Sequence, residues 1–122
     1  MQIFIVEDSP PIRLRLAAMI DAMPGAQVAG EAVTADAAIQ DILKCRPDLV
    51  LCDLHLADGS GFDVLRAVQP QAPQIEFYML SNFSAEPYRQ LAGRLGARGF
   101  FDKSKEFERM RGLIAQRAAG KQ

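Results

Sequence analysis

The chain alternates short apolar runs with longer stretches of helical periodicity, and it does so five times. The runs are rich in Ile, Val, Leu and Phe, which is typical of buried strands. Strands that alternate with helices predict a parallel sheet with helices on both faces. The unbroken apolar run at residues 49–52 predicts a central strand buried on both sides. The expected fold class is therefore α/β, a doubly wound five-stranded parallel sheet with five helices.

Start and stop signals place the expected helices. Ser9 is a candidate N-cap, and Pro10 follows as a first helical residue, where the missing N–H of proline costs nothing. Gly96 is a candidate C-cap residue of a later helix. We expect strands at 3–6, 28–32, 49–52, 76–80 and 99–101, helices at 35–44, 62–68 and 87–95, a first helix from 10 to the Met-Pro-Gly sequence at 23–25, a last helix carrying Phe107, Met110, Leu113 and Ile114, and a frayed tail at 118–122.

Composition narrows the class of protein. A chain of 122 residues with 49% hydrophobic and 24% charged residues suits a single globular domain, 1–122. The formal charge of −1 lacks the basic balance of nucleic-acid-binding domains, so we expect no direct contact with nucleic acid. Neither a signal peptide nor an apolar stretch of membrane-spanning length is present, which predicts a cytoplasmic protein without membrane contact. Cys45 and Cys52 form neither a disulfide framework nor a metal pattern with the single histidine.

Polar side chains gather just past the expected strand ends. Glu7 and Asp8 follow the first strand, Asp53 the third, Ser81 the fourth and Lys103 the fifth. In open parallel sheets, ligands bind at this carboxyl edge, where the strand order reverses. If the first and third strands are neighbours, as in the flavodoxin-like order 2-1-3-4-5 that we expect, three carboxylates meet in one crevice.

Crowded carboxylates predict a bound cation, because like charges a few ångströms apart resist joint ionisation. Magnesium prefers oxygen ligands and keeps several waters, so it suits one or two direct carboxylates. We assign the side chains of Asp8 and Asp53 and the backbone carbonyl of His55 as direct ligands, and Glu7 as a ligand through water.

A carboxylate can also act as a nucleophile and form an acyl phosphate. Phosphoryl transfer needs mainly positioning and neutralisation of the charge on the phosphoryl oxygens. Asp53 is the candidate acceptor, Lys103 and magnesium would supply positive charge, and the Ser81 hydroxyl would donate a hydrogen bond to a phosphoryl oxygen.

Four sequence motifs, in this order and each at an expected strand end, resemble the receiver domain of bacterial two-component response regulators, and the likeness covers nearly the whole chain. They are Ile-Val-Glu-Asp-Ser-Pro at 5–10, Leu-Cys-Asp-Leu-His-Leu-Ala-Asp-Gly-Ser-Gly at 51–61, Met-Leu-Ser-Asn at 79–82 and Gly-Ala-Arg-Gly-Phe-Phe-Asp-Lys-Ser at 96–104.

The resemblance implies a chemotaxis-regulator-like signalling switch rather than an enzyme. It implies an acidic pair at Glu7 and Asp8, a phosphoacceptor at Asp53 and a lysine of the family's type at Lys103, with the switch residues Ser81 and Phe100. The implied phosphoryl donor is a sensor histidine kinase or a histidine phosphotransfer protein. The implied readout is a shift of the fourth helix, fifth strand and fifth helix, which alters contacts with a downstream protein or, in a homodimer, with a second copy.

Three positions depart from the family's usual pattern. Ser104 stands where proline commonly follows the lysine, so we do not expect a cis peptide there, and Ser104 becomes a candidate cap of the last helix. Ala57 replaces a frequent proline, which leaves the conformation of that loop open. Phe100 replaces tyrosine, which removes any readout through a phenolic hydroxyl.

Two other functions stay open at this point. A small phosphatase with an aspartate nucleophile is disfavoured because His55 stands where such enzymes often carry a second aspartate. A docking module that is never phosphorylated is disfavoured by the full set of polar residues. No output domain follows the last helix, so the chain either signals through protein contacts or is a piece of a longer regulator.

Overall fold

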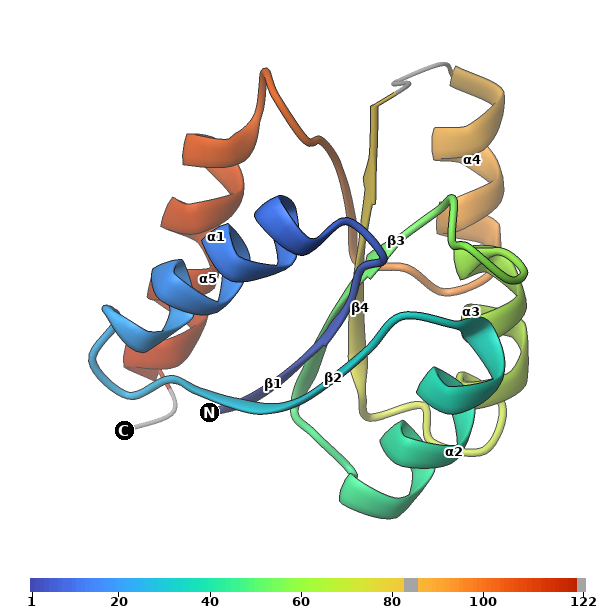
Figure 1. Ribbon diagram of the computed structural model, residues 1–122, viewed down its shortest axis with the longest axis horizontal. Coiled ribbons are helices and arrows are strands. Elements are labelled where there is room, and N and C mark those ends of the chain that lie inside the picture. The colour runs from blue at the N-terminus through green and yellow to red at the C-terminus, as the bar shows by residue number, and fades with distance from the viewer. Residues whose placement is uncertain (83–85, 121–122) are drawn as a thin grey trace.

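The computed structural model describes residues 1–82 and 86–120 and confirms the expected α/β fold. All strands are parallel, and the sheet order is β2-β1-β3-β4-β5. Figure 1 shows the sheet between two layers of helices. The strands are β1 (Gln2–Val6), β2 (Gln27–Ala32), β3 (Leu49–Asp53), β4 (Glu76–Ser81) and β5 (Gly99–Asp102), and the helices are α1 (Pro10–Asp21), α2 (Ala35–Cys45), α3 (Gly61–Val68), α4 (Glu86–Arg94) and α5 (Phe107–Gly120).

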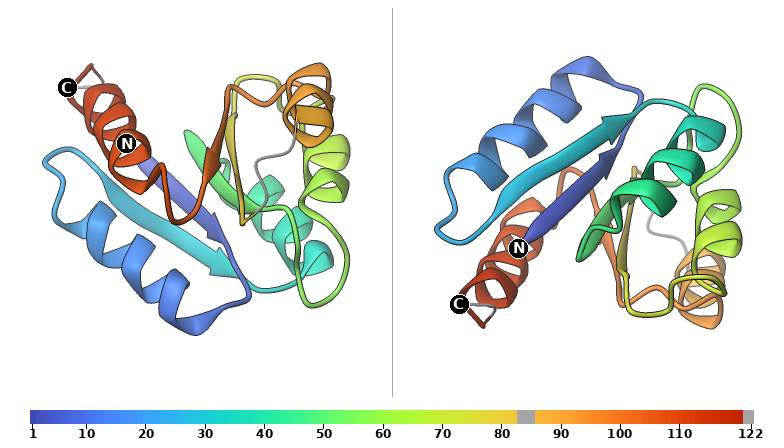
Figure 2. Two further views of the ribbon diagram at one scale, coloured as in Figure 1. Left: turned by 90° about the horizontal axis from the view of Figure 1, so that it is seen from above. Right: turned by 90° about the horizontal axis from the view of Figure 1, so that it is seen from below.

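Alternate residues of each strand divide the core into two parts. Ile3 and Ile5 of β1 pack with α1 and α5, whereas Phe4 and Val6 pack with α2, α3 and α4. The same period of two continues in β3 and β4, as expected for strands whose side chains point to opposite faces. The two views of Figure 2 show α1 and α5 on one side of the sheet and the other helices on the opposite side. Burial on both faces explains why β3 is an unbroken apolar run.

Local capping fixes most helix ends near the expected positions. Ser9 and Pro10 start α1 as predicted, although the Ser9 side chain makes no capping hydrogen bond. Gly96 ends α4 with a φ of 102°, while its N–H donates to Gly93 O and the Ala97 N–H to Ala92 O. These two bonds form a Schellman motif, which explains the glycine at this position.

Two expectations near the C-terminus are wrong. A frayed tail was expected at 118–122, but α5 continues to Gly120 and the Ala118 side chain is buried in the core. Residues 121–122 lie outside the described residues. Ser104 does not cap α5, which begins at Phe107; its hydroxyl instead donates to Asp102 Oδ1 at 2.9 Å. The expected absence of a cis bond at 103–104 is confirmed, since the described residues contain no cis peptide.

In the part of the chain that the structure describes, every helix is too short or too polar to cross a membrane.

The start of α3 lies directly against the end of β3. The N–H of Gly61 donates to Leu54 O at 2.8 Å, and a Cβ atom on Gly61 would lie 2.2 Å from the backbone oxygen of Asp53. Only glycine allows this approach without moving the backbone that carries Asp53. Ser60 N-caps α3, and the Asp63 side chain accepts from the Ser60 N–H to complete a capping box.

Replacing Gly61 by alanine should destabilise the protein by about 1–3 kcal/mol, the usual cost of inserting a carbon into a closely packed site. Gly112 is the matched control, because it lies inside α5 with nothing within 4 Å of an added Cβ. Gly112→Ala should stabilise by roughly 0.5–1 kcal/mol through helix propensity. Urea unfolding measures both values, and equal effects of the two substitutions would contradict the close approach at Gly61.

Candidate functional site

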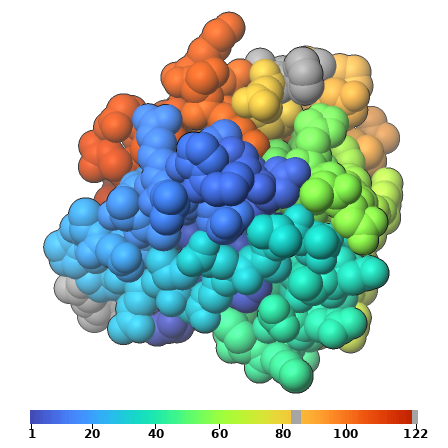
Figure 3. Space-filling view, viewed as in Figure 1, coloured from blue at the N-terminus to red at the C-terminus, as the bar shows by residue number. Residues whose placement is uncertain are grey.

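The expected polar residues meet at the carboxyl edge of the sheet. Asp53 is the last residue of β3, Ser81 is the last of β4, and Lys103 directly follows β5. The register pairs Val6 with Cys52, so Glu7 comes level with Asp53 as the two strands end. In the space-filling view of Figure 3, the dark blue segment around the start of α1 lies near the green loop that follows β3.

Three carboxylates form a cluster at this edge. Glu7, Asp8 and Asp53 each offer one oxygen, and these oxygens lie within 4.8 Å of one another. Glu7 is fully buried, Asp53 is 3% exposed, and Asp8 is half-buried. Within the residues described, this is the only group of three or more potential metal ligands of the His, Cys, Asp and Glu types.

Lys103 bridges two of these carboxylates. Its Nζ lies 2.8 Å from Glu7 Oε1 and 2.9 Å from Asp53 Oδ2. The Lys103 side chain is 8% exposed, so the ammonium group is largely removed from water. Removing either partner of such a buried pair leaves an uncompensated charge, which costs far more than the loss of a surface ion pair.

Backbone groups hold these side chains in place. The Ser9 N–H donates to Glu7 Oε2 at 3.1 Å, and the His55 N–H donates to Asp53 Oδ1 at 3.3 Å. The Lys103 N–H donates to Ser81 O at 2.9 Å, which anchors the start of the loop after β5 to the end of β4.

Burial changes the acid–base properties of the cluster. It raises the pKa of Glu7 from 4.5 to about 7, and the nearby Asp53 charge adds to this rise, while Lys103 and the Ser9 N–H oppose it. Burial lowers the pKa of Lys103, but its hydrogen bonds to Glu7 and Asp53 outweigh that effect and leave this pKa above 10.5. Lys103 is therefore a cation over the whole neutral range.

The two expected switch residues are both buried. Ser81 is fully buried at the end of β4. The Phe100 ring is 5% exposed and packs in the core beneath α2, α3 and α4. The Phe100 side chain is therefore already buried in this structure, and an inward turn on activation would begin from this buried position.

His55 lies on the exposed surface beside the cluster. Its ring centroid is 6.3 Å from that of Tyr88 in an edge-to-face arrangement. The backbone N–H of His55 donates to the Asp53 carboxylate. The role of the His55 carbonyl as a metal ligand stays a prediction.

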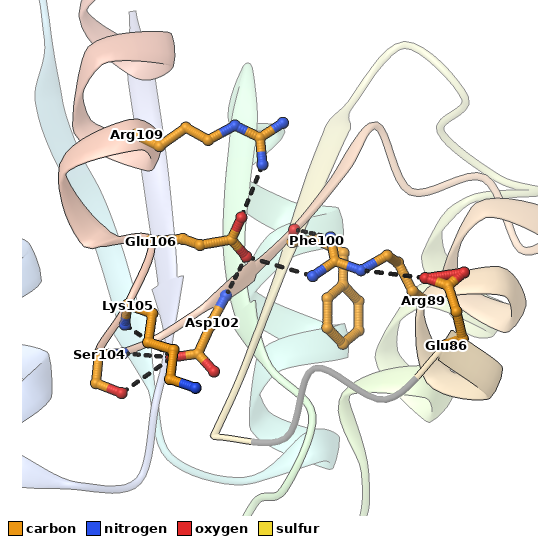
Figure 4. Close-up of polar contacts among 8 residues, drawn as sticks. All are labelled: Glu86, Arg89, Phe100, Asp102, Ser104, Lys105, Glu106 and Arg109. Atoms are coloured by element: carbon orange, nitrogen blue, oxygen red, sulfur yellow. Dashed lines mark hydrogen bonds and ion pairs between the residues drawn. The ribbon is translucent and has the colours of Figure 1, made fainter.

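The residues around Lys103 were not anticipated from sequence. Figure 4 shows Asp102 and Glu106 in a network with Arg89 of α4 that surrounds the turn after β5. The sequence did hold one signal for the contacts of Asp102, because an aspartate side chain often accepts hydrogen bonds from backbone N–H groups two or three residues later. Here those groups belong to Ser104 and Lys105. The contact with Arg89 had no local signal, because the two elements lie apart in sequence.

Comparison with known proteins gives a consistent family. The family model described as "Response regulator receiver domain" matches residues 3–115. A protein-glutamate methylesterase/protein-glutamine glutaminase of Nocardioides sp. is 29% identical over 80% of this chain and 26% of its own length. The DNA-binding transcriptional activator DevR/DosR of Mycobacterium tuberculosis is 27% identical over 84% of this chain and 48% of its own length. This chain thus spans a quarter to a half of these relatives.

Solved structures agree on the fold. The response regulator domain of Thermotoga maritima CheB superposes with a TM-score of 0.85 at 22% identity, over 98% of this chain and 94% of that one. At this identity the likeness concerns the fold alone.

The raised pKa of Glu7 predicts a pH-dependent stability in metal-free buffer. The folded protein holds the Glu7 proton more tightly than the unfolded chain, so its contribution is present below pH 4.5 and is lost as the pH rises toward about 7. The full loss is on the order of 3 kcal/mol. Stability of Glu7→Gln relative to the unmodified protein should therefore increase between pH 5 and pH 8, measured by urea unfolding with a chelator present.

Glu108→Gln is the control for this pH series. The Arg111 guanidinium holds the pKa of Glu108 below its usual value, so Glu108 stays ionised throughout the series. If the free energy of unfolding of Glu7→Gln, relative to the unmodified protein, stays constant over this pH range as it does for Glu108→Gln, the raised pKa of Glu7 is contradicted.

Proposed function

The chain belongs to the response regulator receiver domain family, and from this we propose that Asp53 accepts a phosphoryl group and that the protein is a phosphorylation-dependent signalling switch. The observation that carries the proposal is the environment of Asp53. Its carboxylate ends a central strand, is almost fully buried, and lies 2.9 Å from the Lys103 ammonium. An ordinary surface aspartate has none of these features.

In the transfer, an Asp53 carboxylate oxygen attacks the phosphorus of the donor. The new O–P bond forms as the bond from phosphorus to the donor nitrogen or oxygen breaks, and the leaving group departs with the electron pair of that bond. Lys103 lies beside the acceptor oxygen and would neutralise charge on the transferred group. The hydroxyl of Ser81, which ends the neighbouring strand β4, would donate a hydrogen bond to a phosphoryl oxygen.

The carboxylate cluster fits a magnesium ion. Its donor set is all oxygen, which is the ligand type that magnesium prefers, and the three oxygens lie within 4.8 Å of one another. We assign Asp8, Asp53 and the His55 carbonyl as direct ligands. Glu7, which Lys103 already binds, would act through water. Bound magnesium would supply further positive charge to the phosphoryl oxygens.

The donor class that fits is a sensor histidine kinase or a histidine phosphotransfer protein in the cytoplasm. Phosphorylation would be read at the face formed by α4, β5 and α5, through a downstream protein or a second copy of this chain. Ser81 and Phe100 would connect the site to that face. This chain spans only 26% of the methylesterase and 48% of the transcriptional activator, so the activities in their names are not part of this proposal.

Phosphorylation at Asp53 can be tested by intact mass after incubation with magnesium and acetyl phosphate. One base-labile phosphoryl group should be gained by the unmodified protein and none by Asp53→Asn. Asp58→Asn is the matched control, since Asp58 is an exposed aspartate of the same loop. Equal gain in Asp53→Asn would overturn the proposed acceptor. Steady turnover of a free phosphate ester that depends on Asp53 would favour a phosphatase instead.

Magnesium should raise the melting temperature, because a ligand that binds only the folded state stabilises it by about 2.7 kcal/mol at a hundredfold excess over Kd. Asp8→Asn should reduce this rise strongly. Asp21→Asn, an exposed position at the end of α1, should leave it unchanged. A melting temperature that does not respond to saturating magnesium would contradict the metal site.

A further inference from the structure

We propose that Asp102 and Glu106 are positioning residues that hold the turn carrying Lys103, and that Arg89 ties this turn to α4. The proposal rests on the proposed function of Lys103 and Asp53. It adds a physical connection between the chemistry at the sheet edge and the α4, β5 and α5 face.

Asp102 builds the turn around Lys103. Its Oδ1 accepts three hydrogen bonds, from the Ser104 N–H at 2.9 Å, the Ser104 hydroxyl at 2.9 Å and the Lys105 N–H at 2.8 Å. Asp102 is 5% exposed, and these donors hold its pKa below the usual range, led by the Lys105 N–H. One carboxylate oxygen thus fixes the backbone on the C-terminal side of Lys103.

Glu106 fixes the other side of the same turn. Its Oε1 accepts the Asp102 N–H at 3.0 Å, while the Glu106 N–H donates to Asp102 O at 3.1 Å. The two residues therefore close a reciprocal pair, and Lys103 lies within the loop that they close. The hydrogen bond from the Lys103 N–H to Ser81 O also attaches this loop to the end of β4.

Arg89 extends this arrangement to α4. Its Nη2 lies 3.3 Å from Glu106 Oε1, and its Nη1 donates to Phe100 O at 2.8 Å. The guanidinium carbon also lies 4.9 Å from the centre of the Phe100 ring. Figure 4 shows this single side chain reaching from α4 to both β5 and Glu106. The planar fork of arginine suits such simultaneous contacts, and lysine cannot reproduce them.

The consequence is a coupling in both directions. A partner that draws Arg89 away from Glu106 would loosen the turn and shift Lys103 relative to Asp53. By linkage, if partner binding changes the equilibrium constant for phosphorylation of Asp53 by some factor, phosphorylation changes the affinity for that partner by the same factor. Small displacements suffice, because a misplacement of about 1 Å can cost two orders of magnitude in rate.

The first test measures the rate at which Asp53 gains a phosphoryl group from acetyl phosphate at saturating magnesium, well below the melting temperature. Asp102→Ala should slow the reaction about tenfold. Asp102→Asn keeps a carbonyl acceptor at the same place and should recover most of the rate. The control is Glu108→Ala, which also removes a carboxylate near the start of α5, one that pairs with Arg111 on the surface instead of with the turn.

The second test is a double-mutant cycle between Arg89→Gln and Glu106→Ala. If Arg89 acts through Glu106, Arg89→Gln should slow the reaction about threefold alone and have little further effect in the Glu106→Ala background. Independent effects, which would multiply, overturn the tie to α4.

Melting temperatures of all variants separate positioning from folding. If Asp102→Ala lowers the melting temperature but keeps the unmodified rate, the turn is merely structural and the positioning role is overturned. Failure of the unmodified protein itself to take up a phosphoryl group would instead overturn the proposed function, and the inference with it.

Discussion

The bridge from Lys103 to Glu7 and Asp53 is the interaction on which the site depends. Two buried carboxylates at hydrogen-bonding distance from one ammonium can coexist only because that cation is held between them. Without it, burial and the Asp53 charge would favour the protonated form of Glu7 still more, because even with Lys103 in place they raise the pKa of Glu7 to about 7. The cluster holds three carboxylates and one ammonium group, and this composition supports the proposed magnesium site.

The parallel sheet makes this bridge possible. Glu7, Asp53 and Lys103 are separated by about fifty residues at each step along the chain, yet each directly follows or ends a strand that runs in the same direction. Strand ends that point one way bring their polar residues to one edge, while the strand interiors stay apolar on both faces. Gly61 contributes to the same edge, because it lets α3 begin against the backbone of Asp53.

The turn after β5 shows how one substitution relative to the family pattern is accommodated. With Ser104 after the lysine, the backbone is not held by a proline ring, and Asp102 and Glu106 hold it through hydrogen bonds instead. Hydrogen bonds can be exchanged for others, so this turn is open to influence from Arg89 in a way that a ring is not. Under the proposed function, these contacts would join the phosphoryl chemistry at Asp53 to the face formed by α4, β5 and α5.

The sequence by itself determined the fold and the cluster, because period-two burial, unbroken apolar strands and strand-end polar residues are local signals. It predicted that Glu7, Asp8, Asp53 and Lys103 meet at one edge of the sheet, as they do. We misplaced the end of α5, although Ala118 continues the i, i+4 spacing of Met110 and Ile114 and is buried with them. We also missed the contacts of Asp102, Glu106 and Arg89. Asp102 had a local signal in the backbone N–H groups that follow it, but only the tertiary structure decided the contact between Arg89 and Glu106. That contact depends on how α4 and α5 pack on opposite faces of the sheet, and no local pattern encodes it.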